Sequence, residues 1–136
     1  MLGKLLLRRP VGRFVSLCAI AIFVVLPPRV VEASVGGHTW REFWREDITC
    51  WYAADTIQRS GPSAIVKFIC NSEPTPTKWT VFTVRIQCLA RTYQSIGAEI
   101  YDAQTGALLD RMDLGGAIPE TTPPNSMGAE LTAIVC

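Results

Sequence analysis

The residues with the clearest chemistry are four of the five cysteines. Cys50, Cys70, Cys88 and Cys136 follow one another at intervals of 20, 18 and 48 residues. Zinc and iron–sulfur sites, and redox-active thiol pairs, use close pairs such as C-x-x-C, and no such pair occurs here. The four cysteines therefore predict two structural disulfides, as in short exported proteins. Four cysteines allow three pairings, and their spacing alone does not choose among them.

Residue types that serve in catalysis are present but scattered. His38 is the one histidine, and it precedes the first predicted strand, where a Ser–His–acid site has no rigid support. Asp110 and Asp113 fall on opposite faces of one predicted strand, so they do not face each other as glycosidase carboxylates do. Gly115-Gly116 lacks the Lys-Ser or Lys-Thr of a phosphate loop. We predict no enzyme activity, no catalytic or metal-binding residue and no cofactor.

Aromatic side chains form the candidate binding patch. Large aromatics are enriched in protein interfaces and ligand grooves, but they are also large core residues. One sheet with one helix cannot bury both of its faces, so some of these side chains are expected at the surface. The patch is predicted from Trp40, Trp44, Trp51 and Trp79.

The first 33 residues have the pattern of a secretory signal peptide. A short basic start precedes thirteen uncharged, mostly apolar residues, Phe14 to Leu26, and Pro27-Pro28 ends the run. A membrane-spanning helix needs about 20 apolar residues, so the run is short for an anchor, which is the alternative interpretation. Val31-Glu32-Ala33 places small residues where a signal peptidase reads them. We predict cleavage after Ala33, one domain over residues 34–136, and no stable membrane insertion afterwards.

Charge is distributed unevenly along the chain. Residues 1–33 hold five of the thirteen basic residues and one of the twelve acids, so the remainder carries 8 − 11 = −3. A mildly acidic domain lacks the basic surface that nucleic-acid binding requires. With 49% hydrophobic residues, the chain is also not of the disordered class.

Period-two alternation predicts an antiparallel sheet of about six strands. Segment 39–46 fits a strand or a helix equally well. Cys70 lies on the more apolar face of a strand from Ala64, and Cys88 points inward in the middle of a long strand from about Trp79 to Thr92. The other strands are expected at 48–52, 96–101 and 107–114. Residues 54–56 are expected to form a tight turn or one helical turn with Asp55 as its cap, and the connections include a proline loop at 74–76 and a hairpin at 102–106 in which Gly106 takes positive φ.

The last ten residues predict a helix. Ser126 is a suitable N-cap, and Met127, Leu131, Ile134 and Val135 form one apolar stripe. A helix this short is unstable alone in water, so the stripe needs a sheet face to lie on. Cys136 can fasten it there, and Cys88 is the favoured partner because it is expected mid-strand on the inward face. Cys50 then pairs with Cys70 between neighbouring strands.

Several segments in this order resemble the surface-adhesin protein E family of small exported bacterial proteins, over nearly all of residues 38–136. They are a tryptophan near residue 40, Asp55-Thr56-Ile57, Ile86-Gln87-Cys88, the Tyr101 to Gly106 hairpin, Pro124-Asn125-Ser126 and the terminal Val135-Cys136. The resemblance implies a curved six-stranded antiparallel sheet with the C-terminal helix held on its concave face by a disulfide. The best-known member of the family binds host matrix proteins and haem at the cell surface. The Cys50–Cys70 pair and the proline loop are not part of the family's minimal pattern.

The predicted protein is an α+β, disulfide-stapled, non-catalytic binding protein, exported to the periplasm or the cell surface. Its expected partner is a host or envelope protein, and strand addition at a sheet edge also allows a dimer. The alternative is a structural or interaction subunit of the envelope with no small ligand. An enzyme would require a cleft that gathers carboxylates with shifted pKa values.

Overall fold

The structure is a computed structural model that describes residues 35–136. The predicted signal peptide over residues 1–33 lies outside the described residues. Within them, eight strands form one antiparallel sheet and an α-helix closes the chain. The elements are β1 (Trp40–Arg45), β2 (Thr49–Ala53), the 3₁₀ turn η1 (Ala54–Thr56), β3 (Gln58–Ser60), β4 (Ser63–Asn71), β5 (Lys78–Gln87), β6 (Thr92–Asp102), β7 (Leu108–Asp113), β8 (Glu120–Thr121) and α1 (Met127–Val135).

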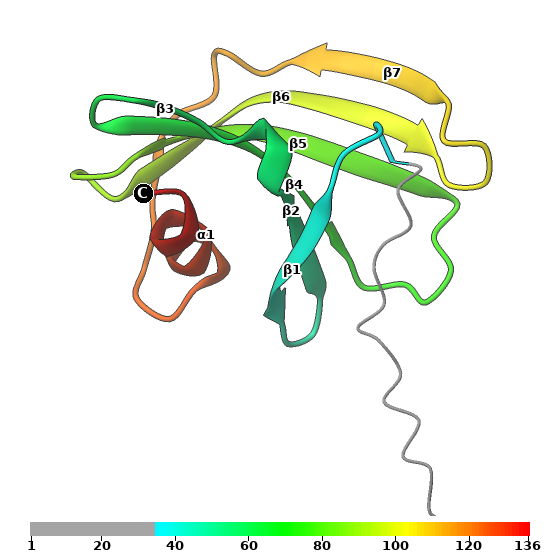
Figure 1. The fold of residues 1–136 in the computed structure, drawn as a ribbon, viewed down its shortest axis with the longest axis horizontal. Coiled ribbons are helices and arrows are strands. Elements are labelled where there is room, and N and C mark those ends of the chain that lie inside the picture. Colours follow the sequence, from blue (N-terminus) through cyan, green and yellow to red (C-terminus); the bar gives the residue numbers. More distant parts are fainter. Residues whose placement is uncertain (1–34) are drawn as a thin grey trace, which may run out of the picture.

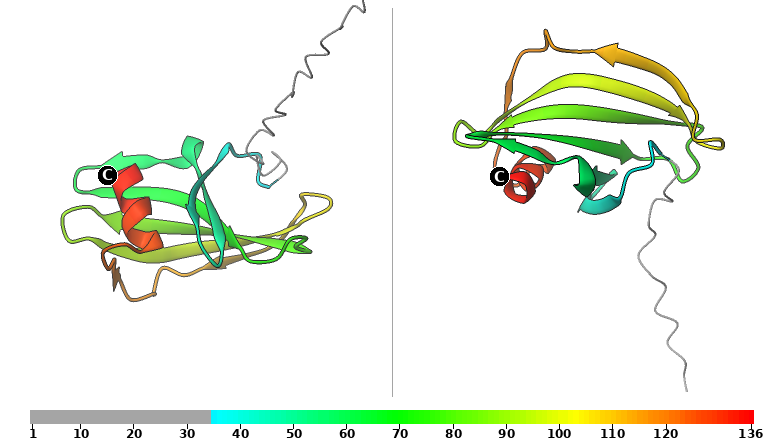
Figure 2. Two further views of the ribbon diagram at one scale, coloured as in Figure 1. Left: turned by 90° about the horizontal axis from the view of Figure 1, so that it is seen from below. Right: turned by 45° about the horizontal axis from the view of Figure 1, so that its top comes forward.

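The sheet has six positions in the order β1-β2-β4-β5-β6-β7. Two short strands, β3 and β8, lie off this path. Strand β3 pairs with the start of β4 while β2 pairs with its end, and β8 pairs with the start of β6 while β7 pairs with its later part. Figure 1 shows the sheet bent into an arch with α1 beneath it, and Figure 2 shows the helix lying across the inner face. The expected six-stranded antiparallel sheet with a C-terminal helix on its concave face is confirmed.

The core under α1 is built from alternate residues of the central strands, as the period-two pattern predicts. Leu131 and Val135 of the helix are buried against it, and Met127 and Ile134 pack at its margin. The whole predicted stripe of α1 therefore faces the sheet. The sheet residues of this cluster are Ala64, Val66, Phe68, Val84 and Ile86.

A second core lies on the opposite face of the sheet. Ile69 follows Phe68 in β4 and so points the other way, yet it is fully buried. The segment before β1 contributes to this cluster through Val35, whose carbonyl oxygen accepts a hydrogen bond from Nε1 of Trp40 at 3.1 Å. Part of the face that α1 leaves free is thus covered. The buried members are Val35, Trp40, Ala53, Ile69, Val81 and Tyr101.

Two local predictions are settled by the strands and turns. The segment around residues 39–46, which fitted a strand or a helix, is strand β1 with a bulge between Glu42 and Trp44. Gly106 takes φ +70° in the hairpin between β6 and β7, as expected. Its N–H donates to the carbonyl oxygen of Asp102 at 2.9 Å, which closes the turn.

The long strand predicted from about Trp79 to Thr92 is wrong beyond Gln87. Strand β5 ends at Gln87, and Cys88 lies in the turn that leads to β6 rather than in mid-strand. The Cys88 N–H donates to the carbonyl oxygen of Pro62 at 2.8 Å, and Arg91 completes the turn with φ +51°. The turn contains neither glycine nor proline, and apolar–polar alternation happens to continue through it. Periodicity alone therefore could not detect it.

Replacing Ser126 by alanine is expected to lower the free energy of unfolding by about 1 kcal/mol. Ser126 is the N-cap of α1, and its Oγ accepts a hydrogen bond from the Ala129 N–H at 3.2 Å. Urea denaturation under non-reducing conditions measures the change. Ser72→Ala in the exposed loop after β4 is the matched control, expected within about 0.5 kcal/mol of the parent. Equal losses in both variants would contradict the capping role.

Candidate functional site

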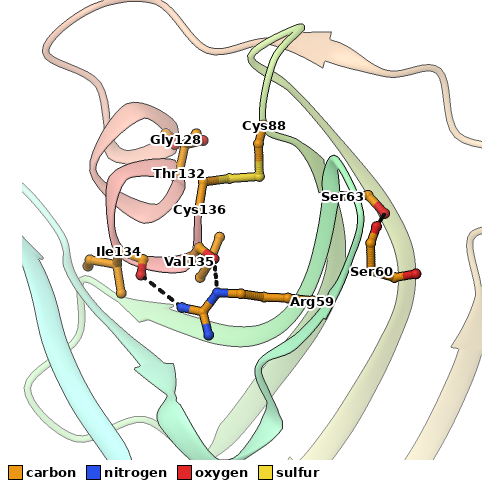
Figure 3. Close-up of a disulfide and its surroundings, with 9 residues drawn as sticks. All are labelled: Arg59, Ser60, Ser63, Cys88, Gly128, Thr132, Ile134, Val135 and Cys136. Atoms are coloured by element: carbon orange, nitrogen blue, oxygen red, sulfur yellow. Dashed lines mark hydrogen bonds between the residues drawn. A yellow bond between two sulfur atoms is a disulfide. The ribbon is translucent and has the colours of Figure 1, made fainter.

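Helix α1 is held at its C-terminal end by a disulfide and by an arginine. The bond joins Cys88 to Cys136, whose Cα atoms are 5.7 Å apart. Arg59 of β3 donates from Nε to the carbonyl oxygen of Val135 at 2.6 Å, and from Nη2 towards that of Ile134 at 3.5 Å (Figure 3). These carbonyl groups lie at the C-terminal end of the helix, where the helix dipole also stabilises a positive charge. The predicted pairing is confirmed although the predicted place of Cys88 was wrong.

The N-terminal end of α1 rests on the second disulfide. Cys50 of β2 and Cys70 of β4 lie directly opposite each other in the register, and their bond is formed as predicted. The Sδ atom of Met127, the first helical residue, lies 3.5 Å from the sulfur of each cysteine. Disulfide sulfurs carry no hydrogen, so these are packing contacts between polarisable atoms. One disulfide therefore tethers the last residue beyond α1, and the other packs against its first turn.

Three of the four predicted patch tryptophans gather on the face opposite α1. Trp40 is only 4% exposed, so it is a core residue. Trp51 and Trp79 are half-buried beside it and meet edge to face, with ring centroids 6.1 Å apart. Trp44 is separate, because it lies opposite Cys50 in the register, and Cys50 shares a face with Met127. The structure thus brings together Trp40, Trp51 and Trp79 but not Trp44.

A buried carboxylate on the same face is a feature that sequence analysis missed. Glu99 lies within β6 and is 8% exposed. Its Oε2 accepts hydrogen bonds from Lys67 Nζ at 2.7 Å and Tyr101 Oη at 3.2 Å, and its Oε1 lies 2.8 Å from Arg111 Nη2. An acid between Ala98 and Ile100, in the otherwise apolar segment 96–101, was the available signal. We call Lys67, Glu99, Tyr101 and Arg111 the Glu99 cluster.

The Glu99 cluster stabilises an ionised carboxylate and does not favour general acid catalysis by Glu99. Burial by itself raises the pKa of Glu99, but the hydrogen bond and charge of Lys67, with the donors of Tyr101 and Arg111, outweigh it and bring the pKa below the ordinary 4.5. Burial and the neighbouring carboxylate raise the pKa of Tyr101. At neutral pH the carboxylate is therefore ionised, and Tyr101 keeps its proton. General acid catalysis needs a carboxyl with a raised pKa, the opposite of what Glu99 has.

An open groove of about 330 Å³ lies beside the Glu99 cluster. It crosses strands β5, β6 and β7, and Glu99 and Arg111 contribute to its wall. Gly97 lies in the groove wall, and a side chain there would come within 3.5 Å of the Met112 carbonyl oxygen. The other lining residues include Thr83, Met112 and Asp113.

His38 is fixed by Asp55, which was expected to cap a turn. Asp55 Oδ2 lies 2.8 Å from His38 Nδ1, and Oδ1 accepts a hydrogen bond from the Thr39 N–H at 2.9 Å. The turn expected at 54–56 is present as η1, but no side chain caps it, so the capping role predicted for Asp55 is wrong. Burial raises the pKa of Asp55, but the hydrogen bonds from His38 and Thr39 lower it by more. The pair fastens the segment before β1 to η1.

Across residues 35–136, no three His, Cys, Asp or Glu side chains are grouped so that they could hold a metal ion. In the same part of the chain, no helix has both the length and the apolar character to cross a membrane.

Comparison of the chain with models of protein families, with curated proteins and with solved structures found no match.

Proposed function

We propose that residues 34–136 form an exported, non-catalytic binding domain of the bacterial envelope, similar in role to the surface-adhesin protein E family. The observation that carries the proposal is the pair of disulfides associated with the two ends of α1. Disulfides persist in oxidising compartments and are rare in the cytosol. The resemblance implies the same clamped helix on a curved six-stranded sheet.

In this proposal the domain binds its partner and does not catalyse a reaction. The Glu99 cluster holds an ionised carboxylate between two cations, and His38 is engaged by Asp55. Both carboxyl groups, Glu99 and Asp55, have a pKa below the ordinary value, whereas a carboxyl that acts as a general acid needs a raised pKa. The groove beside the Glu99 cluster, on the face that α1 leaves free, supports a binding role for that face.

Titration of purified residues 34–136 against extracellular-matrix proteins and haem tests the proposal. We expect saturable binding that Thr83→Phe weakens, because Thr83 lines the groove. Thr80→Phe is the matched control, since Thr80 lies in the same strand, has the same type and points to the opposite face. The absence of saturable binding by the parent protein would overturn the host-ligand part of the proposal.

A second candidate function is a structural or interaction subunit of the envelope without a small ligand. It is favoured by strand β7, a free sheet edge whose six residues are all exposed. Isolation of a stable native complex from envelope fractions, together with no matrix-protein or haem binding, would favour this candidate over the first.

A further inference from the structure

Strand β7 is an open sheet edge, and three of its six exposed residues are large and apolar. The unpaired backbone N–H and C=O groups of an edge strand can form hydrogen bonds with a strand of another chain, and natural proteins usually protect such edges for this reason. Leu108, Leu109 and Met112 of β7 are 46%, 51% and 41% exposed. They are three of the five exposed large hydrophobic side chains in residues 35–136. The edge thus combines free backbone groups with apolar surface.

The ladder with β6 determines which backbone groups of β7 point outward. The Leu114 N–H donates to the Ile96 carbonyl oxygen at 3.1 Å, and the register pairs Met112 with Ala98. In an antiparallel ladder alternate residues bond inward, so Met112 bonds to β6 like Leu114. Arg111 and Asp113 therefore direct their N–H and C=O groups away from the sheet. Consistently, the Arg111 N–H is bonded by a side chain, Asp110 Oδ1, at 2.8 Å.

We propose that β7 pairs antiparallel with β7 of a second copy, about a two-fold axis centred on Met112. An antiparallel pair with a closed two-fold axis places one residue opposite its own copy. Centres on Asp110, Arg111 or Asp113 would set identical charges face to face, which is destabilising. The Met112 centre sets methionine against methionine. Of the four centres between Asp110 and Asp113, it alone avoids a like-charge pair.

The same register joins opposite charges and uses the outward backbone groups. Arg111 then lies opposite Asp113 of the partner subunit, and Asp113 opposite the partner's Arg111. These two residues exchange N–H···O=C bonds twice, so the interface has four backbone hydrogen bonds and two ion pairs on one face of the joined sheet. The bulge at Leu109 in the β6–β7 ladder limits the paired stretch to residues 110–114. Asp110 must release the Arg111 N–H, so its carboxylate competes with pairing.

Cysteine cross-linking of the purified 34–136 chain tests the pairing and its register. Met112→Cys should give a covalent dimer on mild oxidation, because the two sulfurs face each other across the axis. Asp110→Cys is the matched control: its two copies would lie about 14 Å apart along the strands and should cross-link at least tenfold less. Peptide mapping first verifies that Cys50–Cys70 and Cys88–Cys136 are intact in both variants. Equal cross-linking by both variants, or none by Met112→Cys, would overturn the proposal.

Sedimentation equilibrium provides a readout without an added thiol. We expect a concentration-dependent dimer whose dissociation constant rises about tenfold or more in Asp113→Arg, which sets arginine against Arg111 of the partner subunit. Asp110→Ser should tighten the dimer by removing the competing carboxylate. A strictly monomeric parent chain at millimolar concentration would refute self-pairing and would leave the proposed ligand binding, which is titrated separately, unaffected.

Discussion

Replacing both Cys88 and Cys136 by serine is expected to lower the free energy of unfolding by about 4 kcal/mol. The bond spans 48 residues, and closing a loop of that length removes much of the conformational freedom of the unfolded chain. It also tethers a nine-residue helix that is too short to be stable alone. Urea denaturation of the parent and the double variant measures the loss. A change below 1 kcal/mol would contradict a stabilising clamp.

The matched control is the Cys50→Ser/Cys70→Ser double variant, which removes the other disulfide. Its loop of 20 residues is shorter, and we expect a loss of about 3 kcal/mol. The two variants should have similar free energies of unfolding but should differ in which part of the protein opens locally. Amide hydrogen exchange of α1 should rise strongly without Cys88–Cys136, which leaves the helix end held only by Arg59 and by the packing of Val135, and should rise less in the control. Equal exchange in both variants would indicate that the bond to Cys136 does not hold the helix.

The Glu99→Gln substitution is expected to cost roughly 2 kcal/mol at neutral pH. It removes the charge that pairs with Lys67 and Arg111 and leaves the largely buried Lys67 ammonium facing a neutral amide. This loss is smaller than the loss expected for a fully buried ion pair, because the Arg111 side chain is 67% exposed. Glu42→Gln is the matched control, because Glu42 also pairs with an arginine that is 67% exposed, but lies at the surface. We expect that variant to lose less than about 1 kcal/mol.

The same variant should change how stability depends on pH. The pKa of Glu99 lies below 4.5 in the folded protein, so between that value and 4.5 the unfolded chain binds more protons. The contribution of Glu99 is therefore complete above about pH 5 and is lost as the pH falls through the folded pKa. Denaturation curves between pH 3 and 7 should have a shallower acid slope in Glu99→Gln. An unchanged slope would contradict the role of the Glu99 cluster.

The sequence predicted those parts of the fold that depend on local pattern. Alternation in β4 placed Val66 and Phe68 on the inner face, and the stripe of α1 indicated which side of the helix meets the sheet. The cysteine pairing followed because Cys136 ends an apolar helix that needs a partner. The curvature of the sheet came from the family resemblance rather than from any residue pattern.

The features that the sequence could not predict depend on contacts between distant segments. The second core packs Val35 and Trp40 against residues of β4, β5 and β6, namely Ile69, Val81 and Tyr101. The Glu99 cluster joins Lys67, Glu99 and Arg111 from three strands, and no local spacing relates them. The turn at Cys88 was missed because alternation continued through it. A single alternating pattern also cannot separate Trp40, a core residue, from Trp51 and Trp79 at its margin.

The clamp on α1 is tested most directly by non-reducing peptide mapping of the folded protein purified from cells that express the full sequence. We expect one linked pair of peptides carrying Cys88 and Cys136, another carrying Cys50 and Cys70, and a chain that begins after Ala33. Free thiols on Cys88 and Cys136 in the folded protein, or a different pairing, would contradict both the architecture and the export on which the proposed function rests.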